Sequence, residues 1–405
     1  MFYILSEDVF LVNGHAKSCI YDFRNSKLYR INNALAREIE RAGKGDFADK
    51  DVQGELKKIF GYLMDEGVIM LSSQPRFSEI YDMKKEIECS FAWIEVTEKC
   101  NLKCRHCYNE SNLYRESSMT FEDYKIVVDS LLKLGIKRIQ IIGGEPFFIA
   151  DILKEMLDYT VGKFDAIEIF TNGTMLSNEW MEYLKIANIR VALSVYSYDS
   201  EVHDKVTKCK GAWEKTNITI KKLKEYGIKY RVCNVLMRDV ALGSSTTDLY
   251  TLSSEKDIVR MAGRANFLLL TDELIKKKLI TKETFSHPLN KKSLCTTICG
   301  HNCFASKIYI SAKLEVFPCV MERRIKHCIV SECDGIQLKK SIQELNKDHI
   351  DVCCCCEYRY ACFDCRPDSL SGELLEKPWY CTYDPLLGKW QDEDEFIMHL
   401  KDKWL

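Results

Sequence analysis

The sequence predicts an α/β protein built on a parallel sheet, with a smaller domain at each end. Between residues 91 and 236, short apolar runs alternate with amphipathic helical segments, as in a parallel sheet with crossover helices. The first 75 residues instead suggest a hairpin followed by helices and a short strand. Thirteen of the twenty cysteines lie after residue 290, which indicates a separate cysteine-rich domain.

The N-terminal segment has the element order of a winged helix over residues 1–75. We expect strands at 9–12, 18–22, 27–31 and 68–71, and helices at 33–42 and 52–65. Such a domain can bind DNA, serve a purely structural role, or receive an extended peptide along a strand edge. The polar residues 73–89 are expected to form a helix within a linker at 76–90.

The central segment repeats a strand and a helix. We expect strands at 91–96, 138–142, 166–170, 190–195 and 229–236, and helices at 120–134, 151–160, 177–187 and 212–226. Three informative sequences, KCNLKCRHCYN, GGEP and TNGT, each follow a strand. Parallel barrels keep their chemistry at that end of the strands. Residues 257–265 are expected to be helical and then turn, with no chemistry assigned.

Cys100, Cys104 and Cys107 stand in a C-x3-C-x2-C pattern. Three thiolates this close can hold three irons of one [4Fe–4S] cube and leave the fourth iron without a protein ligand. A zinc site completed by His106 or His301, or a disulfide framework, are the alternatives. The GGEP turn, which begins 36 residues after Cys107, favours the cluster.

Composition places the chain among globular proteins. It has 405 residues, 46% of them hydrophobic and 29% charged. A net charge of −2 gives no reason to expect nucleic acid or an anionic membrane as partner. The sequence shows no apolar run of membrane-spanning length and no signal peptide. We therefore expect a cytoplasmic protein whose cysteines are metal ligands and not disulfides.

With these motifs in this order, the sequence resembles the radical S-adenosylmethionine (SAM) enzymes. The resemblance implies a partial (β/α)6 TIM-like barrel over residues 91–290, in which the cluster at Cys100, Cys104 and Cys107 binds SAM and releases a 5′-deoxyadenosyl radical. It also implies SAM contacts from Gly143, Gly144, Glu145, Pro146, Thr171, Asn172 and Ser194. A tight turn, an ordinary loop and a buried serine are the simpler interpretations of these residues.

The last cysteines resemble the SPASM extension of radical SAM peptide-modifying enzymes, here over residues 291–405, which binds two auxiliary [4Fe–4S] clusters. The resemblance assigns Cys299, Cys303, Cys319 and Cys365 to the first cluster, and Cys353, Cys356, Cys362 and Cys381 to the second. Cys295 competes with Cys299, and Cys354 or Cys355 could shift the register. A pair of structural zinc knuckles is the alternative.

Taken together, the resemblances imply a maturase that oxidatively modifies a ribosomally synthesised precursor peptide, by a thioether, carbon–carbon or carbon–oxygen crosslink. It is similar to the type found beside ATP-grasp peptide ligases. The expected cofactors are SAM and three [4Fe–4S] clusters. The expected partners are a peptide whose leader binds the N-terminal domain and an external one-electron reductant of the flavodoxin or ferredoxin type. The alternatives are a radical SAM oxidoreductase with a non-peptide substrate and a metal- or redox-sensing winged-helix DNA-binding regulator.

Overall fold

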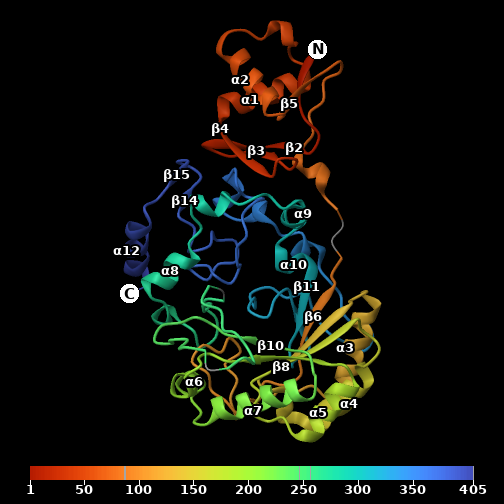
Figure 1. The fold of residues 1–405 in the computed structure, drawn as a ribbon. Helices are drawn as coiled ribbons and strands as arrows, with labels where there is room; N and C mark the ends of the chain where they lie inside the picture. The colour runs from red at the N-terminus through yellow and green to blue at the C-terminus, as the bar shows by residue number, and fades with distance from the viewer. Residues whose placement is uncertain (86–87, 246, 256, 405) are drawn as a thin grey trace.

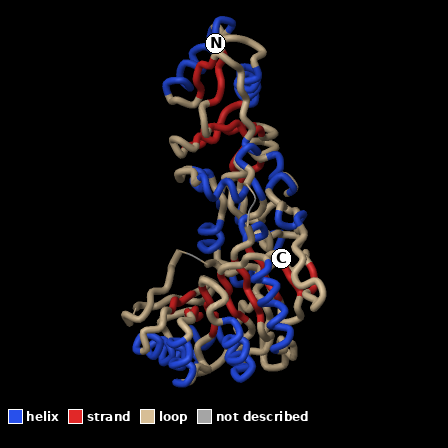
Figure 2. The backbone as a smooth tube through the Cα atoms, turned by 90° about the vertical axis from the view of Figure 1, so that its right-hand side faces the viewer, coloured by secondary structure: helices blue, strands red, loops and turns tan. Residues whose placement is uncertain are grey.

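The computed structural model describes residues 1–85, 88–245, 247–255 and 257–404 (Figure 1). An N-terminal lobe, residues 1–72, stands at one end of the molecule and the main sheet lies at the other (Figures 1 and 2). Much of the cysteine-rich region, residues 291–404, lies between them. Among the described residues, no helix combines the length and apolar character that a bilayer crossing requires.

The main sheet has eight strands in the order β10-β9-β8-β7-β6-β11-β12-β13. Their bounds are β6 Phe91–Glu95, β7 Arg138–Ile142, β8 Ala166–Thr171, β9 Arg190–Ser194, β10 Tyr230–Cys233, β11 Lys307–Ile310, β12 Glu315–Phe317 and β13 Cys328–Ile329. Neighbours from β10 to β11 are parallel, and β12 and β13 continue antiparallel. This large parallel sheet confirms the predicted α/β class.

The crossover helices lie along the outer side of the sheet (Figure 1). They are α3 Phe121–Lys133, α4 Ala150–Thr160, α5 Asn178–Ile186, α6 Ser200–Thr207 and α7 Ala212–Glu225. Helix α3 begins directly after Thr120, the first residue of the predicted helix, because Thr120 and Asp123 bond each other's backbone N–H groups. Fully buried side chains such as Ile94, Ile141 and Leu131 fill the space between strands and helices. Helix α6 was not predicted.

The sixth parallel strand is contributed by the cysteine-rich region. Strand β11 pairs with β6, with Lys307 opposite Phe91 and Ile310 opposite Ile94. The predicted repeat of strand and helix therefore supplies only the five parallel strands β6–β10. The sheet continues across the domain boundary that we predicted at residue 290.

The N-terminal lobe holds two small sheets and two helices. Strands β2 Val9–Asn13, β3 Lys17–Asp22 and β4 Lys27–Asn32 form an antiparallel meander, and β1 Phe2–Leu5 pairs with β5 Ile69–Ser72. Helices α1 Asn33–Lys44 and α2 Gly54–Asp65 lie between β4 and β5. Strand β1 was not expected, and the winged-helix interpretation stays a prediction.

The meander of the lobe packs on the cysteine-rich region. Tyr21 donates to the carbonyl oxygen of Glu357 at 2.9 Å. Arg30 donates from Nε to Oε1 of Glu357 at 2.9 Å and from NH2 to the hydroxyl of Tyr383 at 2.8 Å. Apolar side chains of β2 and β3 pack with Tyr358 and other apolar residues of that region. The lobe is thus held by both buried polar and apolar contacts.

Short elements complete the chain. They are α8 Asp272–Lys278, α9 Lys291–Cys299, α10 Asn302–Ser306, α11 Lys340–Gln343, α12 Glu393–Trp404, β14 Tyr383–Asp384 and β15 Lys389–Trp390. The predicted linker helix is wrong for the described part, which has only a 3-10 turn at Ile80–Met83; residues 86 and 87 lie outside the description. The predicted helix at 257–265 is also wrong, because Ile258 forms a parallel bridge with Leu236 and the chain then turns.

Candidate active site

A cavity of about 450 Å³ lies at the carboxyl ends of strands β6 to β10. Eight of the residues predicted to bind SAM or the cluster line it, namely Cys100, Cys104, Cys107, Gly143, Gly144, Thr171, Asn172 and Ser194. Glu145 and Pro146 do not line it. The structure therefore brings the three strand-end sequences together around one space.

The three cysteines of the loop after β6 lie close to one another. Burial raises the pKa of Cys100 to about 12, with smaller effects from Glu145 and Cys107. Burial, Cys107 and Cys100 raise the pKa of Cys104. Such thiols stay protonated on their own, and a metal that binds them must displace their protons. The loop therefore fits a metal group that binds strongly enough to offset the cost of deprotonating these thiols.

Two segments that had no assigned role hold this loop. At the end of α6, the carbonyl of Thr207 accepts from the N–H of Lys103 at 3.1 Å. Arg264 donates from Nε to the carbonyl of Cys104 at 2.8 Å and from its guanidinium to the carbonyl of Ser111 at 3.1 Å. Gly263 (φ +59°) lies so close that a Cβ there would be 2.4 Å from the carbonyl oxygen of Cys107. The available sequence signal was the pair Gly263-Arg264: a glycine allows a close backbone approach, and an arginine supplies hydrogen-bond donors.

The paired glycines of GGEP serve the packing of this same loop. A Cβ on Gly143 would lie 2.7 Å from the carbonyl oxygen of Thr97, and one on Gly144 only 2.1 Å from that of Lys99. The N–H of Gly144 donates to Thr97 and that of Glu145 to Lys99, both at 2.7 Å. We predicted that both glycines contact SAM, which is one reason for glycine at these positions. The contacts give a second reason, which is the close approach of two backbones.

We expect Gly144→Ala to damage the cluster loop while the sheet stays folded. The added methyl group cannot avoid the carbonyl of Lys99, because both partners are backbone atoms. The variant should lose the iron held by this loop, and its rate of SAM cleavage should fall by more than about tenfold. Iron analysis and 5′-deoxyadenosine release measure this. Gly61→Ala, in helix α2, where nothing lies within 4 Å of the added group and the backbone is helical, is the control.

Glu145 joins two of the strand-end sequences. Its buried carboxylate accepts from the hydroxyl of Thr171 at 2.7 Å and from the N–H of Asn172 at 2.8 Å. Burial raises its pKa to about 7, against the effect of these bonds. Asn172 in turn donates to Oδ1 of Asn101 at 2.9 Å. Glu145 therefore orients the TNGT turn, and Pro146 starts the 3-10 turn Pro146–Ile149.

Several cavity residues were not predicted, although His106 was considered as a zinc ligand. The rings of His106 and His203 both pack against that of Tyr196, and burial lowers the pKa of each histidine to about 4. Arg231 donates to Sγ of Cys233 at 2.7 Å. These polar side chains share the cavity wall with the carboxyl ends of the strands. Apart from His106, which stands inside the three-cysteine motif, no motif marks them in the sequence, because each depends on which face of its strand or loop meets the cavity.

Three of the four cysteines assigned to the first auxiliary cluster come together. A hydrogen bond with Cys319 lowers the pKa of Cys303 to about 7, and Cys365 is close enough to oppose this. The thiol of Cys299 lies elsewhere, beside Cys295, and accepts from the N–H of Lys85 at 3.2 Å. The structure therefore does not bring Cys299 into the set that we predicted. We call Cys303, Cys319 and Cys365 the first auxiliary group.

We expect Cys299→Ala to retain the iron of the first auxiliary group and Cys303→Ala to lose it. The reason is that only Cys303 lies within this group. Three thiolates suffice for a cube, as at the SAM site. Iron and sulfide analysis of both variants after anaerobic reconstitution measures the difference. Equal loss from both would mean that Cys299 moves to the group when iron binds.

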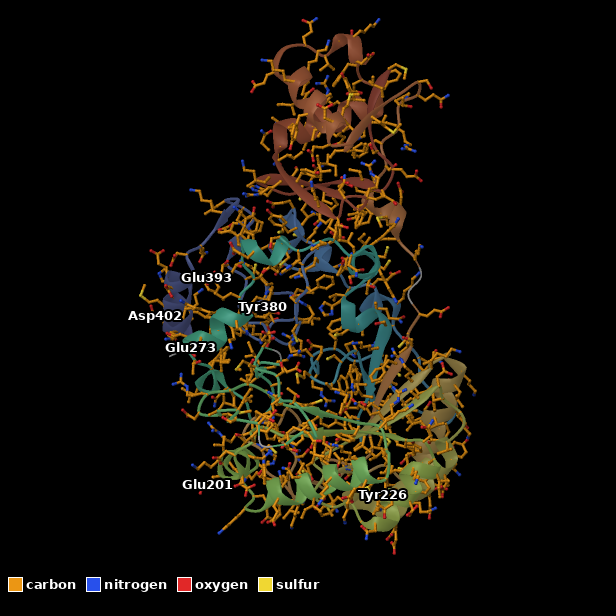
Figure 3. The ribbon with its side chains drawn as sticks, in the orientation of Figure 1. Glu201, Tyr226, Glu273, Tyr380, Glu393 and Asp402 are labelled. Atoms are coloured by element: carbon orange, nitrogen blue, oxygen red, sulfur yellow. The ribbon has the colours of Figure 1, made fainter. Side chains whose placement is uncertain are left out.

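All four cysteines assigned to the second auxiliary cluster line one small space, with Lys347 beside them. They are Cys353, Cys356, Cys362 and Cys381, and we call them the second auxiliary group. Cys354 is exposed and does not line this space. Tyr380, labelled in Figure 3, is buried, and its hydroxyl accepts from the N–H of Cys365 at 2.8 Å.

The second auxiliary group lies in a positively charged interior. Nζ of Lys347 is 3.5 Å from Sγ of Cys362 and 3.0 Å from Oδ1 of Asp364. Arg366 pairs with the same carboxylate, and both cations are at least 95% buried at the side chain. Two buried cations with one shared carboxylate leave a net positive charge, which is costly unless an anion is near. Thiolates bound to a metal group would supply that anion.

The described cysteines do not form a compact mononuclear site. No group of three or more His, Cys, Asp or Glu side chains in the described ranges is close enough to share one metal ion. In an iron–sulfur cube each thiolate binds a different iron, so the thiolates need not share one centre.

Comparisons with known proteins address the main-sheet region first. The family model described as the radical SAM superfamily matches residues 94–239. The antilisterial bacteriocin subtilosin biosynthesis protein AlbA of Bacillus subtilis (strain 168) is 40% identical over 143 residues, which are 35% of this chain and 32% of AlbA. The match thus spans about a third of that relative. The AdoMet-dependent heme synthase of Methanosarcina barkeri (strain Fusaro / DSM 804) is 24% identical over 73% of this chain and 96% of that protein.

A solved structure of native anSMEcpe with bound AdoMet resembles the chain in fold. The TM-score is 0.50 at 16% identity, over 77% of this chain and 96% of that chain. At this identity the likeness bears on the fold alone. The matched residues 94–239 contain the three-cysteine loop, GGEP, TNGT and Ser194, which the cavity brings together. Residues 94–239 are therefore a radical SAM domain.

Proposed function

We propose that the chain is a radical SAM maturase that oxidatively crosslinks a ribosomally synthesised precursor peptide. The observation that carries the proposal is the shared cavity. Its wall includes the cysteines of the SAM loop and also Val320 and Met321, which follow Cys319 of the first auxiliary group. AlbA, 40% identical over the matched region, is named for the biosynthesis of a bacteriocin, which supports a peptide-derived product.

The chain's own residues would bind, orient and shield the reacting parts. Cys100, Cys104 and Cys107 would hold the SAM-binding cluster, with Gly143, Gly144, Thr171, Asn172 and Ser194 around SAM. The bound cofactors would supply a carbon radical for hydrogen abstraction and acceptors for the electron that the substrate loses. Trp93, Phe170 and Tyr196 line the cavity and would exclude water from a reactive carbon centre. The protein thereby contributes geometry and a dry space.

The N-terminal lobe would receive the leader of the precursor along an edge of the β2-β3-β4 sheet. Strands β2 and β4 are the two edges of that sheet in the described residues. Because the lobe packs on the cysteine-rich region, a leader held there would start close to the auxiliary groups. An external one-electron reductant of the flavodoxin or ferredoxin type would supply electrons.

The test is mass spectrometry of a candidate precursor peptide treated with reconstituted enzyme, SAM and reductant. We expect a product lighter by two hydrogens, because crosslinking removes two hydrogen atoms and adds none. Deuterium should pass from a carbon-deuterated residue of the peptide into 5′-deoxyadenosine. A parallel reaction in deuterated water is the control, and it should place no solvent deuterium on carbon.

Other products would contradict specific parts of the proposal. Unchanged mass with solvent deuterium at an α-carbon would make the chain an epimerase, in which the auxiliary groups do not accept substrate electrons. Added mass would indicate group transfer. SAM cleavage that no peptide accelerates would favour the second candidate, a radical SAM oxidoreductase with a non-peptide substrate. That candidate is supported by the long match to the heme synthase of Methanosarcina barkeri.

A further inference from the structure

Glu95 ends strand β6 just before the cluster loop, and it is almost fully buried (1% exposed). Its two carboxylate oxygens face different parts of the chain. Oε1 accepts from Nδ2 of Asn109, two residues after Cys107. Oε2 accepts from the hydroxyl of Tyr309 at 2.7 Å and from the N–H of Ala312 at 3.0 Å. One carboxylate thus joins the loop of Cys107 to strand β11 and the turn after it.

The Tyr309 side of this contact leads to the first auxiliary group. Strand β11 pairs with β12, and Cys319 follows β12 by two residues. Arg323, four residues later, donates from NH2 to the hydroxyl of Tyr309 at 2.7 Å, and its guanidinium lies 4.0 Å from the ring centre. Because the Tyr309 oxygen accepts from Arg323, its proton points toward Glu95.

Tyr108 lies close to both of these loops. It lines the cavity directly after Cys107. Burial raises its pKa, as do the nearby groups Glu95, Cys107 and Cys319. The phenol is therefore close to both cysteine loops, and the position of one loop relative to the other determines the shape of the cavity wall there.

We propose that Glu95 is a positioning residue that holds the loop of Cys107 in register with the loop of Cys319. This inference rests on the proposed function, since it concerns the clusters that those cysteines would hold. Glu95 touches neither cysteine and acts through Asn109 on one side and Tyr309 on the other. It thereby sets how the SAM-binding loop faces the first auxiliary group.

The chemistry of the neighbours favours a carboxylate at this position. Asn109 Nδ2, the Tyr309 hydroxyl and the Ala312 N–H all donate to Glu95. Glutamine has one acceptor oxygen and one NH₂ donor. In Glu95→Gln, an NH₂ turned toward the Tyr309 side would face two donors in a buried place. An NH₂ turned toward Asn109 would require that amide to turn over, and Asn109 would then lose its donation to Oγ of Ser111 at 3.1 Å.

The test uses the reconstituted full-length enzyme. Glu95→Gln should keep the iron of all clusters but bind SAM about tenfold more weakly, the size expected for one unsatisfied buried group. The electron paramagnetic resonance (EPR) spectrum of the reduced, SAM-bound enzyme should also change shape, which a simple loss of stability would not cause.

Asp22→Asn is the matched control. Asp22 is a fully buried carboxylate whose oxygens accept from the N–H groups of Arg24 and Asn25 and from the Asn25 side chain, far in sequence from the cysteines assigned to the clusters. Its EPR spectrum and SAM affinity should match the wild type.

Two outcomes separate this inference from the proposed function. A wild-type chain that holds no cluster overturns both. A wild type with clusters, together with Glu95→Gln of unchanged spectrum and SAM affinity, overturns this inference alone. If Glu95→Gln does not fold, Asn109→Ala and Tyr309→Phe each remove one side of the contact. Their effects on SAM affinity should be non-additive, because both act through one carboxylate. Additive effects would also overturn the inference.

Discussion

Cys104→Ala is expected to lose about four of about twelve irons and all SAM cleavage. Among the described residues, four thiols line the cavity, and three of them are Cys100, Cys104 and Cys107. The fourth, Cys233, lies outside the loop and accepts a hydrogen bond from Arg231. With two ligands left, the loop cannot hold a cube with one open iron. Iron analysis, EPR and 5′-deoxyadenosine release together measure this.

Cys209→Ala is the matched control for that loss. Cys209 packs in the same small apolar cluster as Cys100 and Cys104, but it lies outside the C-x3-C-x2-C pattern. The Cys209→Ala variant should keep all its iron and its SAM cleavage activity. Stoichiometric zinc with negligible iron in the wild type, or full iron in Cys104→Ala, would refute the assignment of the loop.

Asp364→Asn is expected to destabilise the cluster-free protein by about 3–5 kcal/mol. The change leaves Lys347 and Arg366 without their shared carboxylate in an interior from which water is nearly excluded. If metal-bound thiolates neutralise the same cations, the loss of folding stability should be clearly smaller in the protein that carries its clusters. The measurement is the thermal unfolding midpoint of both forms under anaerobic conditions.

The comparison of loaded and cluster-free protein decides what the cations neutralise. Asp22→Asn serves again as a control, because its buried site lies in the N-terminal lobe and its cost should not depend on cluster loading. An equal loss for Asp364→Asn in both forms would show that Lys347 and Arg366 do not respond to the thiolates of the second auxiliary group.

Local periodicity predicted the central strands and helices, because each buries one face against its neighbour in sequence. Strand β11 lacked such a signal: its four residues KIYI pair with β6, about two hundred residues earlier. At 257–265 the apolar spacing suggested a helix. The backbone there is instead extended and then turned, and Gly263 and Arg264 contact the cysteine loop. No local sequence pattern predicts these contacts.

The candidate site was predictable where unusual residues follow a strand. Cysteines, paired glycines and TNGT all did so, and parallel pairing gathers strand ends automatically. Side chains whose role depends on the direction in which they point could not be predicted from the sequence. Glu145 was expected at SAM but faces Thr171 and Asn172, and Glu95 carried no motif at all. The spacing of Cys299 could not reveal that helix α9 ends with its thiol turned toward Lys85.

The pairing of β6 with β11 also fixes an order of events during synthesis. Strand β6 has β7 on one side, but its other edge stays open until Lys307–Ile310 leaves the ribosome. At about 5–20 residues per second this takes roughly 10–40 s. For that time the nascent chain presents an unpaired edge next to the buried residues Ala92 and Ile94. Chains truncated before residue 307 should therefore aggregate, whether or not they carry a cluster.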